Sequence, residues 1–463
     1  MSRHRVITAA MVVAAVAMLV SCTTSPHTPP AALSDRQADP VVLTGAQLPS
    51  LKGTPVGDIV AFSWRAGAWA QIPVQVDERK NVELNTVYGK PANTTNPVMA
   101  TVYADPNTFV GAGSGMLTDL DEIAFMAADT GDVAPSANPS DVIASSRVHL
   151  TVTDPRDGHQ ASAYLFRRAS SALSPDAGQH YVIYAFRLTS GAYKTTYNVD
   201  AGPNPETSQV HTSAYTRGFH DRWQDDVLTV NTPGASGVDI LDRQKELFAP
   251  GNCVRSEDTF DSGEGAFIAN ISGPVRAIRS FIGANSGPYT ERTQIFYAQR
   301  EDDITFLRVH SIPAVMNFFD YSNAARGMTY SNSLNTGGFA IDGKPDAVVA
   351  GRQQWDKVDG PQGALTHVWT LQTSISPITV TNYYEDNDTN PTTQCTGDSA
   401  ALGSSGMWIT STLPNTDPHN GTAASLTGTD TMYYESPGRS ASDASQHAAQ
   451  VAQPLTVSVQ PGS

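Results

Sequence analysis

The sequence has few charged residues, few cysteines and no extended helical periodicity. Charged side chains make up 16% of the 463 residues, and only three cysteines are present. No long stretch repeats its apolar residues with the 3.6-residue period of an amphipathic helix. Gly and Pro are abundant instead, at 36 and 30 residues. This composition argues against a helical bundle and favours short strands joined by turns.

Several motifs of phosphate binding and hydrolysis are also absent. The chain contains no GxxxxGK[ST] loop, no HExxH, no GxSxG and no Gly-rich dinucleotide fingerprint. Acidic residues outnumber basic ones by 45 to 29, which gives a net charge of −16. An excess of negative charge disfavours nucleic acid and anionic lipid as main partners. The sequence therefore predicts neither a nucleotide nor a nucleic-acid partner.

Long apolar runs are missing except at the N-terminus, where Val6–Val20 follows the basic residues Arg3 and Arg5. This run has the length of a signal peptide and is too short to span a membrane comfortably. The run ends in Leu19-Val20-Ser21-Cys22, which resembles the lipobox of bacterial lipoproteins. The resemblance implies that residues 1–21 are removed and that Cys22 carries lipid. An ordinary cleaved signal or a single N-terminal anchor is the alternative. We therefore expect the protein to lie outside the cytoplasm and to be anchored to the membrane through this lipid.

The other two cysteines form an even pair in an oxidising compartment. We therefore expect a disulfide between Cys253 and Cys395, with two buried free thiols as the alternative. A bridge across a loop of this length stabilises a fold by roughly 4–5 kcal/mol on the chain-entropy model.

Composition divides the chain into segments. Residues 22–39 are rich in Pro and small polar residues and are expected to form an extended lipidated tether. Residues 40–170 are predicted to form a small N-terminal β-domain, and 171–435 a larger β-sandwich domain. The interruption at residues 169–178 marks the boundary. Residues 436–463 are expected to be a flexible tail, with one more strand at 455–459.

Alternating apolar residues predict the strands. Residues 147–152 and 163–166 flank an Asp-Gly turn signal and predict a hairpin. A second hairpin is predicted from 293–298 and 304–310, with its turn at 300–303. Many short strands with Gly, Pro and Asn turns predict an all-β, antiparallel β-sandwich fold. The size of the second domain suits a super-sandwich.

The first candidate site lies in residues 210–222. If these residues begin as one strand, His211, Tyr215 and Arg217 share a face, and His220 follows closely. His and Tyr can transfer protons, and Arg can bind a carboxylate by two hydrogen bonds. The residue types suit β-elimination at a uronic acid and resemble polysaccharide lyase sites in residue types only. The alternative is a polar sheet face in which Arg217 or Arg222 pairs with Asp225 or Asp226.

Three further residues are candidates for substrate binding. Trp223 adjoins the His and Arg residues and can stack on a sugar ring. Arg276 and Arg279 are three apart, so on a strand only one of them can face a given cleft. His310 ends the second predicted hairpin. The alternative for each is a structural role.

Two acidic stretches are candidate metal-binding sites. Asp386 and Asp388 lie in an acidic stretch whose oxygens suit calcium, as do Asp119, Asp121 and Glu122. Neither stretch has EF-hand spacing, and a solvated turn explains both as well. Calcium is the one cofactor for which the sequence offers ligands.

Two functional classes are consistent with these observations. One is a membrane-anchored, carbohydrate-active enzyme, either a polysaccharide lyase or a glycoside hydrolase. The other is a non-catalytic lipoprotein that binds glycan or builds the cell envelope. Convergence of His211, Tyr215 and Arg217 on one cleft, with Trp223 in its wall, would favour the enzyme.

Overall fold

A computed structural model describes residues 33–248, 255–284, 290–307, 311–389, 391, 400–414 and 425–461. Within these residues almost all regular structure is antiparallel β-sheet, which confirms the predicted all-β sandwich. Three α-helices occur in the described chain: α1 (Tyr193–Thr196), α2 (Glu257–Ser262) and α3 (Ala441–Ala452). Short 3-10 turns lie at Gly45–Gln47, Val56–Asp58, Leu84–Tyr88, Ala127–Asp129, Ala144–Ser146 and Asn323–Ala325.

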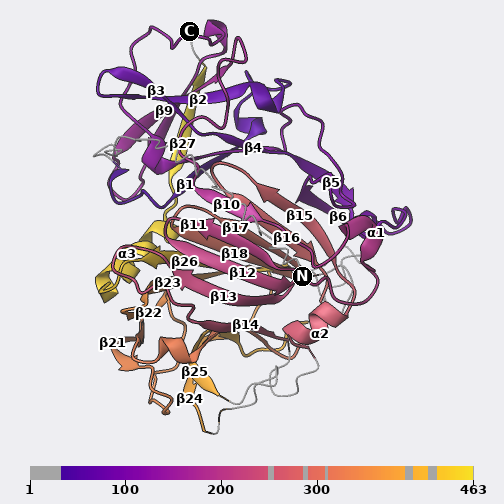
Figure 1. Cartoon of the computed structure of the whole chain (residues 1–463), viewed down its shortest axis with the longest axis vertical. Coiled ribbons are helices and arrows are strands. Elements are labelled where there is room, and N and C mark those ends of the chain that lie inside the picture. Colours follow the sequence, from indigo (N-terminus) through magenta and orange to yellow (C-terminus); the bar gives the residue numbers. More distant parts are fainter. Residues whose placement is uncertain are drawn as a thin grey trace, which may run out of the picture.

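The N-terminal part consists of three small sheets (Figure 1). The five-stranded sheet has the order β27 (Thr456–Pro461), β8 (Val148–Thr153), β9 (Gln160–Arg167), β2 (Ile59–Arg65) and β3 (Ala68–Ile72). The three-stranded sheet has the order β1 (Pro40–Thr44), β7 (Glu122–Met126) and β4 (Gln75–Asp77). The two-stranded sheet pairs β5 (Arg79–Glu83) with β6 (Met99–Tyr103).

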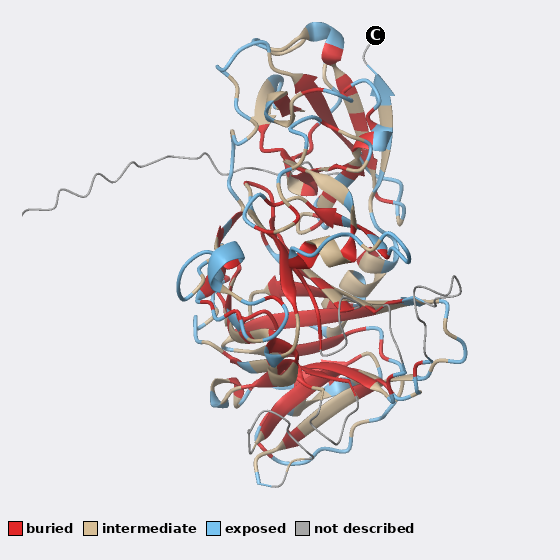
Figure 2. Ribbon diagram, turned by 90° about the vertical axis from the view of Figure 1, so that its right-hand side faces the viewer, coloured by how far each residue is buried: buried red, intermediate tan, exposed pale blue. Residues whose placement is uncertain are grey.

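The larger part contains one nine-stranded sheet and two four-stranded sheets. The nine-stranded sheet has the order β15 (Ala266–Ser272), β16 (Ala277–Ile282), β17 (Thr290–Phe296), β18 (Arg300–Leu307), β26 (Leu426–Glu435), β23 (Gly363–Thr373), β22 (Asp356–Gly360), β20 (Thr329–Asn332) and β21 (Asn335–Ala340). One small sheet is β10 (Val182–Ala185), β11 (Ser208–Thr212), β12 (Tyr215–Asp221) and β13 (Gln224–Val230). The other is β14 (Leu241–Leu247), β19 (Val315–Tyr321), β25 (Ala401–Ile409) and β24 (Val380–Asn387). Figure 2 shows that buried residues concentrate in these strands.

Both predicted hairpins form. In β8 the buried residues alternate with half-buried ones, as expected of a strand with one face in the core. β8 pairs with β9 across a turn in which Gly158 has φ +77°. β17 pairs with β18, but the turn falls at residues 297–299 and not at 300–303. The charged residues predicted as a turn instead continue the strand. Glu301 and Asp303 pair with arginines inside the sandwich, and Arg300 pairs with Asp302 and Asp39 on the other face of the strand.

A row of polar residues runs from strand to strand across the inner face of the nine-stranded sheet. Directly paired residues on neighbouring strands point to the same face of a sheet. The register therefore defines a polar row of Asn270, Arg279, Gln294, Asp303, Asp430 and Trp369. Both four-stranded sheets contact this row: Gln294 donates to Asp225 of β13 at 2.5 Å, and Gln244 of β14 donates to Asp303 at 2.8 Å.

The C-terminal residues are folded, so the prediction of a loose segment at 436–450 is wrong. Ser440 caps α3 by a reciprocal hydrogen-bond pair with Asp443, and the Ala-rich sequence has high helix propensity. The helix packs on the outer face of the nine-stranded sheet, where His447 stacks on Tyr433 with ring centroids 3.9 Å apart. β27 then joins β8 in the N-terminal sheet. None of the helices in the described ranges is both long and apolar enough to cross a membrane.

Candidate functional site

The predicted His/Tyr/Arg constellation is divided by a hairpin turn. β11 ends at Thr212 and β12 begins at Tyr215, so His211 lies opposite Thr216 on the neighbouring strand. The prediction that His211, Tyr215 and Arg217 share one strand face is therefore wrong. The physical reason is local: the Thr212 hydroxyl accepts the N–H of Tyr215 at 3.0 Å and closes the turn.

Tyr215 and Arg217 lie in the core of the larger part, where both are fully buried. The Tyr215 hydroxyl donates to the carbonyls of Tyr297 and Arg300 at 3.0 and 3.2 Å. Its ring stacks on Tyr434 with centroids 3.8 Å apart. These contacts give Tyr215 a structural role and hold it away from solvent.

The two histidines of the constellation lie on the surface. His211 is exposed, and its ring nitrogens contact Thr216 and Gln209. His220 is also exposed, and its Nδ1 contacts the carboxylate of Asp226. Neither ring lines one of the cavities described below. The four candidate catalytic residues thus divide into two surface histidines and two core residues.

The predicted substrate-binding residues are buried as well. Trp223 is 2% exposed, so its description as an accessible stacking platform is wrong; its indole N–H donates to the Gly283 carbonyl at 2.8 Å. Arg276 is 1% exposed and is ion-paired with Asp77 and Glu122 of the N-terminal part, each at 2.7 Å. It joins the two parts of the chain. The predicted residues Cys22, Cys253, His310 and Cys395 lie outside the described residues.

The predicted calcium ligands have protein partners. The Asp386 carboxylate accepts the backbone N–H groups of Asp342, Gly343 and Gly403 at 2.8 to 3.1 Å. Asp388 is paired with Arg326 at 2.5 Å. No cluster of three metal-binding side chains occurs in the described ranges. Calcium binding by Asp386 and Asp388 stays a prediction.

Carboxyl groups outnumber the arginines that contact them in the core next to the four-stranded sheets. Arg217 is 3.2 Å from Asp225 and 3.5 Å from Glu301. Arg292 is paired with Glu246 and lies 3.1 Å from Asp303. Two guanidinium groups thus contact four carboxyl groups. Burial raises the pKa of Glu246 and of Glu301 to about 8.

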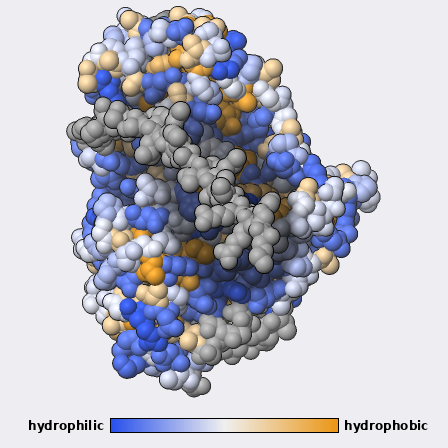
Figure 3. All heavy atoms as spheres, in the orientation of Figure 1, coloured by the Kyte–Doolittle hydropathy of each residue, from blue (hydrophilic) through white to orange (hydrophobic). Residues whose placement is uncertain are grey.

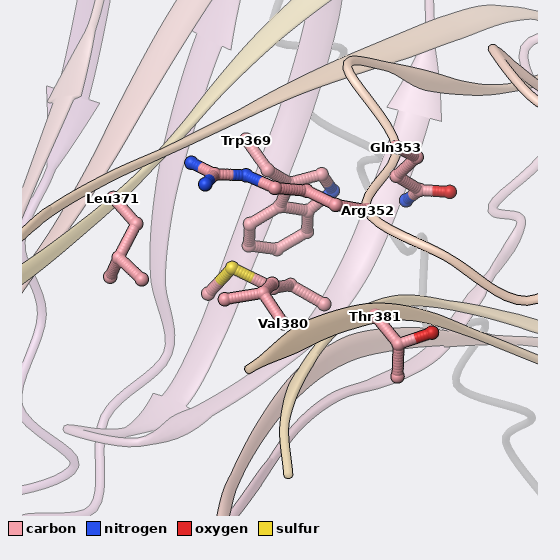
Figure 4. A pocket seen from close by; sticks show the side chains of 7 residues that line it. Arg352, Gln353, Trp369, Leu371, Val380 and Thr381 are labelled. Carbon is pink, nitrogen blue, oxygen red and sulfur yellow. The ribbon is translucent and has the colours of Figure 1, made fainter. Parts of the chain in front are cut away.

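Two small cavities meet at Trp369, at one end of the polar row. The first, about 20 Å³, is lined by Glu246, Asp430 and Trp369 among others. The second, about 10 Å³, also touches Met407 and is lined by Arg352 and Val380 among others; Figure 4 shows the Arg352 side chain lying across the indole ring, above Val380. A cavity of 20 Å³ has room for about one water molecule. These cavities are too small for a sugar ring.

A larger cleft lies at the other end of the polar row, where the N-terminal part meets the sandwich. We call this space, about 470 Å³ in volume, the junction cleft. Pockets of about 300–1,000 Å³ are typical of small-ligand sites. It is lined by Asp105–Thr108, Phe186, Leu188, Gly191–Thr195 and Asn270. Figure 1 shows α1, which forms one wall, beside β5 and β6. The molecular face in Figure 3 is mainly hydrophilic, with hydrophobic side chains in small groups.

The α1 wall is fixed by its sequence. Gly191 has φ +67°, and a Cβ atom there would lie 1.8 Å from Oγ1 of Thr196, so only glycine fits this tight turn. The turn places the Tyr193 ring against Phe267, with centroids 5.6 Å apart. Lys194 reaches across the cleft and donates to the Pro106 carbonyl at 2.8 Å.

Asp105 and Asn270 are two of the polar residues that line the cleft. The Asp105 carboxylate is buried and accepts the backbone N–H groups of Asn107 and Asn270, both at 2.8 Å. The Asn270 side-chain oxygen accepts the Tyr184 hydroxyl at 2.7 Å. Its amide nitrogen is buried and has no hydrogen-bond partner among the described residues. The nitrogen has almost no accessible surface, so a ligand in the cleft could contact it only if its surroundings moved.

Sequence reasoning did not find the junction cleft. The turn signals around Asp105-Pro106-Asn107 and Gly191 are visible in the sequence. Asn270, however, lies in an ordinary strand, 165 residues from Asp105. No local pattern indicates that these segments meet.

Comparison with known proteins assigns no family. No family model matches the chain, and no curated protein matches its sequence. A solved structure described as a putative aldose 1-epimerase from Escherichia coli K12 is similar over 55% of this chain and 100% of its own length, with 11% sequence identity and a TM-score of 0.27. That similarity is too low to assign either a family or an activity to this chain.

Proposed function

We propose that the chain is an extracytoplasmic, lipid-anchored protein that binds sugar in the junction cleft. The observation that carries the proposal is the lining of this 470 Å³ cleft, which combines an apolar wall with polar side chains. Phe186, Leu188 and Tyr193 form the apolar wall, and the polar side chains that line the cleft include Asp105, Asn107, Thr108, Lys194 and Thr195. Sugars bind through this combination, because their C–H faces pack on aromatic rings while their hydroxyls need fixed partners.

The proposal is tested by measuring the binding of a glycan panel to the purified full chain by calorimetry. We expect binding to at least one glycan and its loss in Phe186→Ala, which removes part of the apolar wall. Ile183→Ala is the matched control, because Ile183 is 64% exposed on β10 and does not line the cleft. Equal binding by both variants, or no binding by the unaltered chain, would reject the proposal.

The lipid anchor is the second element of the proposal. It is supported by the four residues Leu19-Val20-Ser21-Cys22 and their apolar context. Mass spectrometry of the N-terminal peptide from the membrane fraction should show acylated Cys22, and Cys22→Ser should release the protein from that fraction. An unmodified N-terminus upstream of Cys22 would reject the anchor.

A carbohydrate-active enzyme is the second candidate function. It is the function for which the sequence offered candidate residues, and the junction cleft, about 470 Å³ in volume, has room for a sugar ring.

The enzyme is tested by incubating the full chain with polysaccharides and following reducing ends together with the ultraviolet absorbance of unsaturated uronides. Both signals together indicate a lyase, and reducing ends alone indicate a hydrolase. Either activity should fall in Phe186→Ala, which removes part of the apolar wall of the junction cleft. Silence on both signals, repeated with calcium, would reject the enzyme and leave sugar binding as the function.

A further inference from the structure

We propose that the buried side chains of Lys245 and Asp320 form a covalent amide bond that crosslinks β14 to β19. In this isopeptide bond the side-chain nitrogen Nζ of Lys245 is joined to the side-chain carbon Cγ of Asp320, and one water molecule is released. The inference concerns a modification inside the sandwich and does not depend on the proposed sugar binding or on the lipid anchor.

The two reacting groups are in contact and shielded from solvent. Nζ of Lys245 lies 2.7 Å from Oδ2 of Asp320, and each side chain is 1% exposed. Three other lysine–carboxylate pairs in the described chain are exposed instead, at Lys52, Lys90 and Lys344. Well-oriented groups that a fold holds in contact reach effective concentrations of about 10⁵–10⁸ M, so a condensation that free side chains do not undergo becomes accessible.

Strand pairing sets the position of the two side chains. β14 and β19 are antiparallel neighbours, and Arg243 lies directly opposite Asp320. Lys245 is two residues further along β14, so it is on the same face of the sheet as Arg243 and is a diagonal neighbour of Asp320. Diagonal neighbours lie about 7–8 Å apart at the backbone, a gap that a lysine side chain spans. The two side chains can therefore join without a change of register.

The hydrogen bonds of Asp320 favour attack on its carboxyl carbon. Oδ1 accepts the hydroxyl of Ser404 and the backbone N–H of Leu402, the latter at 3.4 Å. Both donors can stabilise the negative charge that develops on Oδ1 when nitrogen adds to Cγ. Oδ2, which contacts Lys245, is then the oxygen that leaves.

The reaction needs no oxidant or other co-reactant. One proton passes from the Lys245 ammonium to Oδ2 of Asp320, which gives a neutral amine and a neutral acid. The amine adds to Cγ and gives up a second proton to Oδ2, the Cγ–Oδ2 bond breaks, and Oδ2 leaves as water. Burial favours the first step, because a charged pair loses its hydration in the core. Glu257 interacts electrostatically with Lys245, and burial raises the pKa of Glu257 to about 7, so this carboxyl can exchange protons at neutral pH.

Mass spectrometry of the purified full chain tests the bond. After reduction of the cysteines and digestion with trypsin, we expect a branched peptide in which an uncut Lys245 is joined to the segment that contains Asp320. Its mass should be that of the two peptides less one water molecule. Unlinked peptides of full mass would overturn the proposal and leave an ordinary ion pair. Loss of water within one linear peptide, as in a succinimide at an Asp-Gly step, would overturn it as well.

Two variants locate the bond. Lys245→Met removes the amine and should give only linear peptides. Lys357→Met is the matched control: Lys357 is also buried, but its Nζ lies 3.6 Å from Asp359, so the branched peptide should remain. A branched peptide that persists in Lys245→Met would assign the crosslink to another pair and overturn the proposal. The unaltered chain alone decides whether the bond exists, so the test holds even if Lys245→Met fails to fold.

Discussion

The backbone N–H of Asn270 donates to Oδ2 of Asp105 at 2.8 Å, across 165 residues of sequence. Asn270 belongs to the edge strand β15 of the nine-stranded sheet, and Asp105 follows β6 of the N-terminal part. One carboxylate therefore joins the two parts of the chain and forms the polar side of the junction cleft. Stability and ligand binding depend on the same side chain at this point.

Asp105→Ala should lower both stability and binding. The substitution leaves the N–H groups of Asn107 and Asn270 without their acceptor, at a cost of about 1–3 kcal/mol. Chemical denaturation measures the stability, and calorimetry with a bound glycan measures the affinity. Asp200→Ala is the control: it breaks an exposed pair with Lys90 and should cost less than about 1 kcal/mol. Equal costs in the two variants would contradict the role of Asp105.

Arg276→Met should be one of the most destabilising single substitutions in the chain. It leaves Asp77 and Glu122 without the guanidinium that lies 2.7 Å from each. Removing one partner of a buried ion pair costs about 3–5 kcal/mol. Arg243→Met, which breaks a partly exposed pair with Asp258, should cost less than about 1 kcal/mol. Urea denaturation compares them, and a small effect at Arg276 would refute its role as a link between the two parts.

Substitutions at Tyr215 and His211 should separate structural roles from catalytic ones. Tyr215→Phe removes the donor to two buried carbonyls and should lower stability by about 1–3 kcal/mol. His211→Gln alters an exposed side chain and should change stability by less than about 0.5 kcal/mol. Neither should change glycan binding per folded molecule. If His211→Gln abolished an activity on polysaccharide at unchanged stability, the original assignment of His211 to catalysis would be restored.

Stability should fall as the pH rises from about 6.5 to 8. Burial raises the pKa of Glu246 and Glu301 from an ordinary value near 4.5 to about 8 in the folded chain. The folded state therefore keeps protons that the unfolded state releases, and stability falls until the pH passes the folded pKa. His367 makes stability rise with pH instead, because burial lowers its pKa to about 4 in the folded chain. Most of this rise occurs below pH 6.5, so it has little effect on the slope in the window above.

Denaturation midpoints at pH 6.5, 7.2 and 8 measure this slope. Glu246→Gln cannot ionise and should flatten it. Glu122→Gln is the control: burial opposes ionisation of Glu122, but Arg276 and Arg79 outweigh it and lower the pKa, so this group is charged in both states throughout the window. A slope that is flat in the unaltered chain, or steeper in Glu246→Gln, would contradict the buried acid surplus.

Much of the fold could be predicted because its cause is local. In β8 the alternation of apolar and polar residues has the period of a strand, and the Asp-Gly turn signal places the hairpin. The same reasoning failed at residues 300–303, where charged residues that look like a turn are buried and paired. It failed at α3 for a related reason, since a Ser- and Ala-rich segment suits both a loop and a capped helix.

The site could not be predicted to the same degree. Parity along a strand places His211 and Tyr215 on one face only if no turn intervenes, and Thr212 closes a turn between them. Arg217 and Trp223 have the chemistry of a ligand site, yet their charge and their indole N–H are satisfied inside the core. Residue type alone does not distinguish these roles, because a partner that satisfies a polar group is usually remote in sequence.

The sequence by itself determined the β-sheet class, the acidic charge and the lipobox pattern at Cys22, since each follows from composition or from short-range periodicity. Tertiary structure alone decided which polar residues are buried and which line a cleft. Asp105 and Asn270 become a site only because β15 pairs at the sheet edge beside the loop after β6. The physical reason is that strand pairing and packing bring together residues whose separation along the chain leaves no local trace.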